Sequence, residues 1–434
     1  MHLRTVVPLV APLLLVPLAA AQDGAQDATP PDDPAATQQG VPTAGPGSSQ
    51  GTLFVTPGMP TLGRRVSSGQ VTRFTNDFNP AFSFIIDAVG DWRGVENGEN
   101  GADAFLRTFE LGANAWVDPS AWAYFTAVAE DEFIGVEEAA VHYVGFGNRN
   151  TIRAGRFFID FGKQMQTHVH DLRTLERPLV LREFLGAEVA GDGVQWDSWT
   201  TLGDATVVRW SLGAFASTLT EVEEDEFDPT STALASLDRP KRADDFNYTA
   251  RVTGFTEVGE RGTLQLGTSL RAIPDFSLGY EIDESVSAGD LSNSVVGLDL
   301  TYGWVGETGI DTWTFGGEFL WNLGDKAAGI DDPDATPGSG DESVLVSDDA
   351  HFGWFGYGEY GWNRFNAVGL LLGQAEGVLD DRSELELYYS RMFSEFHRLR
   401  FVLGASDSDL EGNGTRLALQ YTTILGAHGH GVNW

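Results

Sequence analysis

Residues 151–200 read TIRAGRFFIDFGKQMQTHVHDLRTLERPLVLREFLGAEVAGDGVQWDSWT. The two ends, TIRAGRFFIDFG (151–162) and GVQWDSWT (193–200), alternate side chains between two faces, which is typical of β-strands. The residues between them (163–192) make a connection far longer than most loops, and such connections are usually functional or disordered. Their apolar content argues against disorder. The stretch therefore predicts two strands of a β-barrel joined by a loop that folds inward. The large apolar side chains of this loop are Leu172, Leu175, Leu179, Val180, Leu181, Phe184 and Leu185.

The first 21 residues have the composition of an export signal. Arg4 supplies the positive charge, VVPLVAPLLLVPL the apolar core, and a run of three alanines the cleavage site. The apolar run is too short to span a membrane, and its three prolines break a helix. We expect a cleaved signal peptide at 1–21 and then, over 22–75, a Pro-, Gly- and Ala-rich arm whose composition predicts disorder.

The remainder of the chain, 76–434, alternates apolar and polar residues in sixteen segments, each close to the length that a tilted strand needs to cross a bilayer. An open sheet edge in hydrocarbon would leave backbone groups without hydrogen bonds, so the sheet has to close. We predict an all-β fold, a single closed antiparallel transmembrane β-barrel of about 16 strands. The segments are 81–90, 104–116, 121–129, 136–146, 151–160, 193–200, 205–216, 246–257, 262–273, 292–302, 311–322, 351–361, 365–373, 384–392, 397–404 and 414–426.

Short and long connections alternate along these segments. The short ones are VDPS, GFGNRN, LGD, VGER, GWNR and SEFH. The long ones are 161–192, 217–245, 274–291 and 323–350. Outer-membrane barrels have short periplasmic turns at one rim and long external loops at the other. The connection 161–192 is then the third external loop, and we expect it to bend into the lumen.

The charge of the chain limits its partners. The formal net charge is −36, which argues against nucleic acid and anionic membrane surfaces as partners. The acidic runs EVEEDEFD, EIDES and DDPDATPGSGDES lie in the long loops, where carboxylates at a pore mouth favour cations. The sequence has no Gly-x-Ser-x-Gly, His-Glu-x-x-His or phosphate-binding glycine loop, so we predict no enzyme activity.

We expect the inward loop to form the constriction of the pore. Pro178 interrupts any single long helix, so two short turns are expected across the channel. Arg153 and Arg156 lie on opposite faces of their strand, and at least one should enter the lumen, opposite the acidic groups or in a buried ion pair. We take both arginines as lumen candidates. The charges expected at the narrowest point are Asp171, Arg173, Glu176, Arg177, Arg182, Glu183 and Glu188.

Two His-x-His pairs are candidates for metal contact. In an extended segment His168 and His170 share a face and could offer two imidazoles to one borderline metal such as zinc. Two ligands alone make a weak site, and the chain has no cysteine to complete it; ordinary hydrogen bonding is the alternative. The second pair, His428 and His430, falls in the closing periplasmic tail, so the two pairs should not form one site. No other cofactor is expected.

Four runs resemble a family of bacterial outer-membrane barrels. They are NPAFSFIIDAVGDWRG, FLRTFELGANAWVDPSAWAYFTAVAEDE, RAGRFFIDFGKQMQTHVHDLRTLERPLVLREFLGAE and LQYTTILGAHGHGVNW. This family is described as porin-like and related to phosphate-selective porins, and its members are sometimes labelled zinc-regulated TonB-dependent outer membrane receptors. The resemblance covers most of 76–434, and its most specific part is FGKQMQTHVHD followed by ERPLV. It implies an outer-membrane location and the transport of small solutes.

The expected function is an outer-membrane channel for passive diffusion of small polar solutes, with a preference for cations. One alternative is a dedicated zinc-uptake barrel in which His168 and His170 contact the metal. Another is a secreted soluble all-β binding protein. The expected partners are outer-membrane lipid and a small solute or ion, with no nucleic acid, and the pattern leaves a homotrimer open.

Overall fold

A computed structural model describes residues 81–426, with gaps at 99, 131–132, 148, 187, 204, 222–233, 237–241, 281–286, 331–342 and 395. The expected signal peptide (1–21), the arm (22–75) and the His428/His430 pair lie outside the described residues. No helix within the described ranges is long and apolar enough to cross a membrane.

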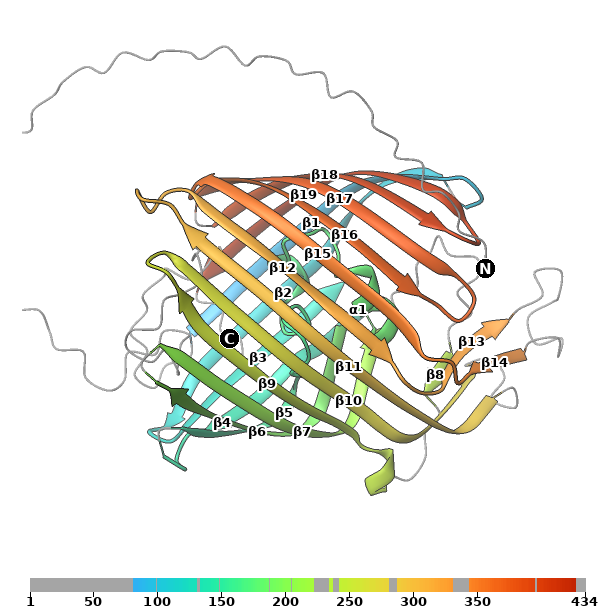
Figure 1. Cartoon of the computed structure of the whole chain (residues 1–434), viewed down its shortest axis with the longest axis horizontal. Helices are drawn as coiled ribbons and strands as arrows, with labels where there is room; N and C mark the ends of the chain where they lie inside the picture. Colours follow the sequence, from blue (N-terminus) through green and yellow to red (C-terminus); the bar gives the residue numbers. More distant parts are fainter. Residues whose placement is uncertain are drawn as a thin grey trace, which may run out of the picture. The chain divides into compact units, whose positions relative to one another are not determined.

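The described chain is built almost entirely from antiparallel strands (Figure 1). The sixteen long strands are β1 (Ala81–Val95), β2 (Gly101–Asp118), β3 (Ala121–Glu130), β4 (Phe133–Tyr143), β5 (Asn150–Phe158), β6 (Glu188–Leu202), β7 (Thr206–Glu221), β9 (Asn247–Val258), β10 (Gly262–Tyr280), β11 (Ser287–Val305), β12 (Thr312–Asn322), β15 (His351–Asn363), β16 (Asn366–Glu376), β17 (Asp381–Ser394), β18 (His397–Ser408) and β19 (Gly412–Gly426). The shorter elements are β8 (Leu234–Ser236), β13 (Lys326–Ile330), β14 (Ser343–Ser347), the 3-10 turns η1 (Val169–Asp171) and η2 (Ala243–Asp245), and the helix α1 (Leu179–Leu185).

The sixteen long strands form a closed ring. Each pairs with its neighbour along the chain, and β1 pairs with β19 from Ser83↔Gly426 to Val95↔Gly414, which leaves no free edge. The predicted closed antiparallel barrel is confirmed, and each of the sixteen predicted segments overlaps one long strand. The predicted loop 274–291 is wrong in part, because β10 and β11 continue their pairing through much of it. The short strands β8, β13 and β14 alternate too briefly to be recognised in the sequence.

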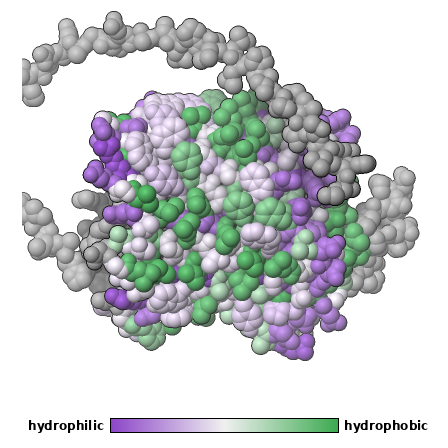
Figure 2. All heavy atoms as spheres, in the orientation of Figure 1, coloured by the Kyte–Doolittle hydropathy of each residue, from purple (hydrophilic) through white to green (hydrophobic). Residues whose placement is uncertain are grey.

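The two faces of the barrel wall differ in polarity. On β16, Val368, Leu370 and Leu372 are exposed, whereas the residues between them are buried. Other strands repeat this pattern, so that large apolar side chains are spread over the outer face, and Figure 2 shows them on one side among residues of near-neutral hydropathy. Aspartate, glutamate, arginine and glutamine side chains occupy much of the buried inner face. An apolar exterior around a polar interior is the arrangement of barrels that cross an outer membrane.

Aromatic side chains mark both ends of the apolar band. On neighbouring strands β12 and β15, the rings of Trp313 and Tyr360 stack with centroids 4.4 Å apart near the rim of short turns. Toward the other rim, Trp321 and Phe352 lie 5.4 Å apart. Amphipathic rings at both ends of a hydrophobic band are typical of the two membrane interfaces.

We call residues 159–186 the inward segment. Its backbone is hydrogen-bonded to inner-face side chains around the ring: the N–H of Gly162 donates to Ser269 on β10 at 3.0 Å, and the N–H of Leu179 donates to Glu384 on β17 at 2.8 Å. On β18, Arg400 donates to the carbonyls of Leu172 and Thr174. Figure 1 shows α1 between the near and the far strands. These contacts support the prediction that the loop folds inward.

Apolar packing holds α1 against the wall. Its side chains join a buried cluster with residues of β3, β5, β7, β11, β12, β15 and β16. The helix begins directly after Pro178, whose missing N–H costs nothing at a helix start. The 3-10 turn η1 and α1 are the two short turns that the proline position predicts. At Gly353 on β15 an added Cβ would collide with Val180, so the helix approaches the wall closely there.

Candidate functional site

A β-bulge turns two consecutive carboxylates of β4 toward the inward segment. The register between β3 and β4 shifts at Thr126 and Ala127. Across this shift, Glu137 and Glu138 both contact the same histidine, although successive residues of a regular strand point to opposite faces. Bulges commonly re-aim side chains in this way beside functional sites.

His168 is held between these two carboxylates. Its Nδ1 lies 3.1 Å from Oε2 of Glu137, and its Nε2 lies 3.0 Å from Oε2 of Glu138. The edge of its ring packs against Phe158, with centroids 4.9 Å apart. The imidazole is 1% exposed, so its position is fixed by the surrounding wall.

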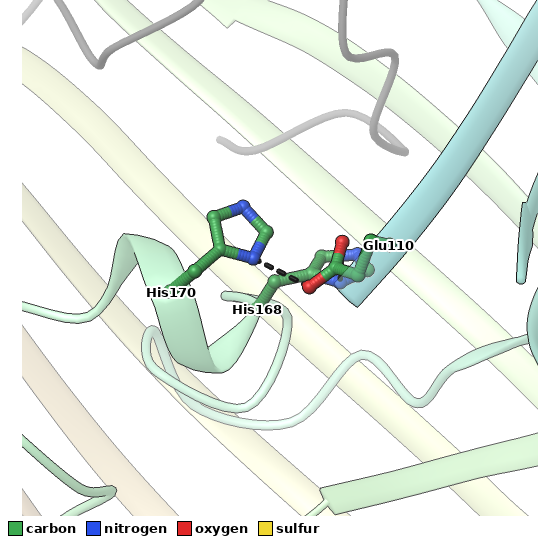
Figure 3. A group of neighbouring side chains, drawn as sticks. All are labelled: Glu110, His168 and His170. Carbon is green, nitrogen blue, oxygen red and sulfur yellow. Dashed lines mark hydrogen bonds and ion pairs between the residues drawn. The ribbon is translucent and has the colours of Figure 1, made fainter. Parts of the chain in front are cut away.

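His170 meets a carboxylate from another strand. Its Nδ1 lies 2.6 Å from Oε1 of Glu110 on β2, and its Nε2 lies 3.7 Å from Oδ2 of Asp171. The other oxygen of Glu110, Oε2, is 3.8 Å from Nδ1 of His168. Figure 3 shows both imidazoles beside Glu110. The three side chains are buried and offer ligand atoms within 4.8 Å of one another, close enough to hold one metal ion.

The carboxylates also set the proton affinity of the two imidazoles. Burial alone would lower the pKa of His168, but Glu137 and Glu138 raise it well above its ordinary value. Burial would likewise lower the pKa of the His170 imidazole, but Glu110 raises it. The cluster therefore favours positive charge at its centre, whether that charge is carried by protons or by a metal ion.

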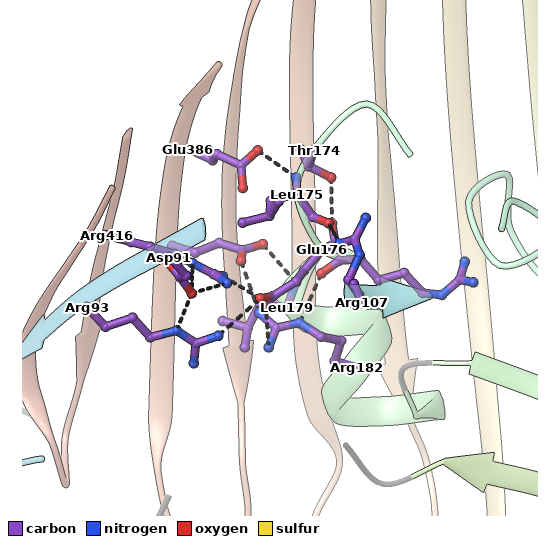
Figure 4. A network of polar contacts seen from close by, with 12 residues as sticks. Asp91, Arg93, Arg107, Thr174, Leu175, Glu176, Leu179, Arg182, Glu386 and Arg416 are labelled. Atoms are coloured by element: carbon purple, nitrogen blue, oxygen red, sulfur yellow. Dashed lines mark hydrogen bonds and ion pairs between the residues drawn. The ribbon is translucent and has the colours of Figure 1, made fainter. Parts of the chain in front are cut away.

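A second polar cluster fixes Glu176 in the inward segment (Figure 4). Its carboxylate pairs with Arg416 on β19, with Arg93 on β1 at 3.4 Å and with Arg182 at 3.6 Å. Asp91 bonds both wall arginines, each at 2.9 Å. Except for Asp91, the side chains of this cluster are 18–26% exposed. This cluster is therefore in contact with solvent in the lumen.

The arginines keep Glu176 ionised. Burial would raise the pKa of its carboxyl, but Arg416, Arg182 and Arg93 hold the pKa well below its usual range. Arg182 also reaches Glu384 on β17 at 3.4 Å. Two predicted constriction residues, Glu176 and Arg182, thus lie side by side in a network that joins the segment to three strands.

Three other predicted constriction residues lie in different surroundings. Arg173 is partly exposed; its Nε lies 3.6 Å from Glu359 on β15, and its guanidinium lies 5.3 Å from the Tyr357 ring. Asp171 is half-buried next to His170, and Glu183 is exposed on α1. The structure does not gather all of these charges at one point.

Arg177 and Glu188 form an ion pair in which the arginine is buried and the glutamate side chain is 18% exposed. Nη2 of Arg177 lies 2.9 Å from Oε1 of Glu188, and its Nη1 donates to the carbonyl of Gln164 at 2.6 Å. Arg177 is only 3% exposed. Its place at the constriction stays a prediction, and these contacts give the guanidinium a part in holding the fold of the segment. Glu188 lies at the start of β6 and not in the loop.

Only one of the two lumen candidates on β5 faces inward. Arg153 is buried, with its guanidinium 3.9 Å from the Phe157 ring centroid. Arg156 lies on the opposite face, where its Nε is 2.9 Å from Asp192, a side chain that is 48% exposed. The position of Arg156 gives no support to a lumen role, whereas the burial of Arg153 is compatible with one; both assignments stay predictions.

We call His168, His170, Glu110, Glu137 and Glu138 the histidine cluster. The sequence alone does not distinguish its three carboxylates from the other acidic residues. Glu110, Glu137 and Glu138 are three of 63 acidic residues, and nothing in the local pattern sets them apart. The one local signal is the Glu137–Glu138 pair itself, because two adjacent charges break the alternation of a strand and are compatible with a bulge.

No model of a known protein family matches this sequence, and no curated protein matches it. Solved structures match its fold: the loop L8 deletion mutant of OmpT, an outer membrane protein of Vibrio cholerae (TM-score 0.51), an anion-selective porin from Comamonas acidovorans (0.50) and OprB from Pseudomonas putida (0.51). Each is 10% identical to this chain and matches 80% of it, over 99%, 99% and 94% of the other chain. At this identity the similarity concerns the fold alone. The chain has the fold of bacterial outer-membrane porins.

Proposed function

We propose that this chain forms an outer-membrane channel through which small polar solutes diffuse passively, with a preference for cations. The supporting observation is the closed sixteen-strand ring whose exposed face is apolar and whose inner face is polar and charged. A closed ring satisfies its backbone hydrogen bonds without water, as hydrocarbon requires. Its polar interior offers the hydrogen bonds that a hydrated solute needs.

A secreted soluble binding protein is disfavoured by the same observation. Leucine, valine and phenylalanine side chains such as Phe319, Leu403 and Leu417 are each about half exposed on the outer face. Soluble proteins rarely expose contiguous apolar patches larger than a few hundred Å². Lipid would cover this face in the proposed location.

The inward segment is the proposed determinant of pore size. Its backbone is tied to β2, β10, β12, β17 and β18, so solutes would pass through the space that it leaves. The partly exposed charges of Arg93, Glu176 and Arg182 would meet them there. The preference for cations rests on the acidic long loops and on the net charge of −36.

A dedicated zinc-uptake barrel has weaker support. The imidazoles of His168 and His170 are 1% and 0% exposed. A transported cation has to enter and leave its site, and conduction requires binding that is weak enough for release. The buried cluster is better suited to retaining an ion than to passing one on.

The test is single-channel recording of the purified barrel in a planar lipid bilayer with a salt gradient. We expect stepwise conductance and a reversal potential on the cation side. Extraction from cells without detergent, gel mobility that does not change on boiling, and no conductance would together contradict the proposal. The relation to phosphate-selective porins and the homotrimer stay predictions; cross-linking in native membranes tests the second.

A further inference from the structure

The histidine cluster joins the inward segment to two strands of the barrel wall. Glu110 lies on β2, Glu137 and Glu138 lie on β4, and His168 and His170 belong to the inward segment. We propose that the cluster is a binding site for one borderline divalent cation such as Zn²⁺, and that the ion ties the inward segment to the wall.

The nitrogen atoms point the right way for this role. Nδ1 of His168 faces Glu110 and Glu137, and Nδ1 of His170 faces Glu110, so both imidazoles direct the same ring nitrogen toward one set of carboxylates. The two nitrogens and the Glu110 carboxylate make a three-ligand set within 4.8 Å, and Glu137, 3.1 Å from Nδ1 of His168, is the candidate for the fourth ligand that zinc takes. Calcium and magnesium prefer oxygen ligands, so the two imidazoles favour a borderline metal over them.

The separations between these atoms suit a metal. Zinc bonds to nitrogen and oxygen are about 2.0–2.2 Å, which puts tetrahedral ligand atoms about 3.4 Å apart. The observed separations are 2.6 Å for His170 to Glu110, 3.1 Å for His168 to Glu137 and 3.8 Å for His168 to Glu110. These three values bracket the required one, and the Glu137 side chain would move toward the other ligands to complete the set.

An outer carboxylate holds the His168 ring in place, and another lies near the His170 ring. Nε2 of His168 lies 3.0 Å from Glu138, and Nε2 of His170 lies 3.7 Å from Asp171. Metal-binding histidines almost always direct their second ring nitrogen to a carboxylate, a carbonyl or water, which fixes the tautomer and the orientation of the ring. Each imidazole thus has one nitrogen for the ion and one for an orienting partner.

Burial and charge complete the case. Glu110 is 1% exposed, and the Glu137 side chain is 10% exposed. Buried carboxylates that face the same imidazole require a compensating cation. A divalent ion meets this need and leaves the imidazoles neutral; two protonated imidazoles would meet it without metal, and the experiment decides between these occupants.

The test uses full-length folded barrel in detergent, treated with chelator and then titrated with Zn²⁺ by calorimetry, with bound zinc counted by mass spectrometry. His428→Ala and His430→Ala are present in every sample, which removes the second His-x-His pair as a competing site. We expect one Zn²⁺ per chain. Substituting Co²⁺ should give visible absorption bands that report the coordination of the metal.

Two variants and one control make the result specific. His168→Ala with His170→Ala should weaken binding at least 100-fold, and Glu110→Gln, which keeps the side-chain size, should weaken it about 10- to 100-fold. His351→Ala with His397→Ala removes two histidines outside the cluster and should change nothing. Heat-modifiable gel mobility verifies that each variant is folded.

The proposal is overturned if the parent barrel binds no Zn²⁺. In that case protonated imidazoles would balance the charge of the carboxylates. It is also overturned if the cluster variants and the control bind equally well. Binding is measured without any conductance, so either outcome leaves the channel function to be judged separately.

Discussion

Glu318 and Lys163 are 155 residues apart in the sequence, yet the N–H of Lys163 donates a hydrogen bond to Oε1 of Glu318 at 2.8 Å. The same oxygen accepts the N–H of Gln164 at 3.0 Å. The inward segment leaves the end of β5, and β12 stands six strands further round the ring. One carboxylate therefore fixes the start of the segment to a distant part of the wall.

Replacing Glu318 tests this anchor. Glu318→Leu removes the acceptor and leaves the buried N–H of Gln164 and the partly buried N–H of Lys163 without it, at a cost of about 1–3 kcal/mol for a buried group. Glu318→Gln keeps a side-chain oxygen and should retain most of the stability. The measurement is urea-dependent unfolding of the barrel in detergent, followed by tryptophan fluorescence. Equal unfolding midpoints for the two variants and the parent would show that the anchor contributes nothing.

Gly162 should tolerate no side chain. Its φ is 55°, a conformation that L-residues adopt at a cost, and an added Cβ would collide with the Glu318 carboxylate. Gly147 also has a positive φ, 93°, but open space around its Cβ position. Gly162→Ala should therefore lower the free energy of unfolding by roughly 2 kcal/mol more than Gly147→Ala. Equal losses of unfolding free energy in the two variants would mean that backbone strain, and not the collision with Glu318, accounts for the effect.

Glu176 should influence ion preference. Glu176→Gln removes one negative charge beside Arg93, Arg182 and Arg416, so the reversal potential in a salt gradient should shift toward anions. Its pKa is held far below the usual range, so the carboxylate stays charged as the pH falls. Its stabilising contribution is present above the ordinary carboxyl pKa and is lost only at strongly acidic pH. The effect of Glu176→Gln should therefore be the same at pH 7 and pH 5.

The control for this substitution is Glu307→Gln. Glu307 has an 82% exposed side chain and pairs with Arg261 at the rim of short turns. It carries the same charge but lies in bulk solvent, where salt screens it. A shift as large as that of Glu176→Gln would indicate that the total charge, not the cluster, sets the preference.

The orientation of the barrel is tested with protease on intact cells. We expect cleavage within the long acidic connections 217–245 and 323–350, which should face the outside, and no cleavage in the short turns GFGNRN and GWNR. Fragments are identified by mass spectrometry, and permeabilised cells serve as the control. Cleavage confined to the short turns would invert the orientation.

The strands could be predicted because each carries its own signal. Alternation, strand length and turn residues are local properties, and on β12 the sequence TWTFGGEFLW alone separates the outward Trp313 and Phe315 from the inward Glu318. The ends of the strands are harder to predict from the sequence. Pairing between β10 and β11 extends beyond the predicted segments because hydrogen bonds to a neighbour continue where the alternation has weakened.

The histidine cluster could be predicted only in part. The spacing of His168 and His170 indicates two ligands on one face. Glu110 meets them because the inward segment folds back toward β2, and Glu137 meets them because of a bulge in β4. These are long-range relationships that local patterns do not carry. The pairing of Arg177 with Glu188 is a similar case, since Glu188 belongs to the next strand.

Removing part of the inward segment tests the pore most directly. Its seven large apolar side chains between Leu172 and Leu185 are at most 6% exposed, and each contributes about 1.5–3 kcal/mol by burial. That packing keeps the segment in the lumen, so replacing Leu172–Leu185 with a short Gly-Ser linker should open the space that it fills. We expect single-channel conductance to rise severalfold and ion selectivity to weaken, because a wide aqueous pore screens wall charges more strongly.

A milder variant guards against loss of the fold in this experiment. Val180→Asp puts a charge against the wall at Gly353, where α1 is closely packed, and should release the helix without shortening the chain. Conductance then rises in both variants, while circular dichroism and heat-modifiable mobility stay those of a closed barrel. Unchanged conductance in folded forms of both would mean that the segment does not limit the pore, and that Asp171, Arg173, Glu176, Arg182 and Glu183 are not constriction residues.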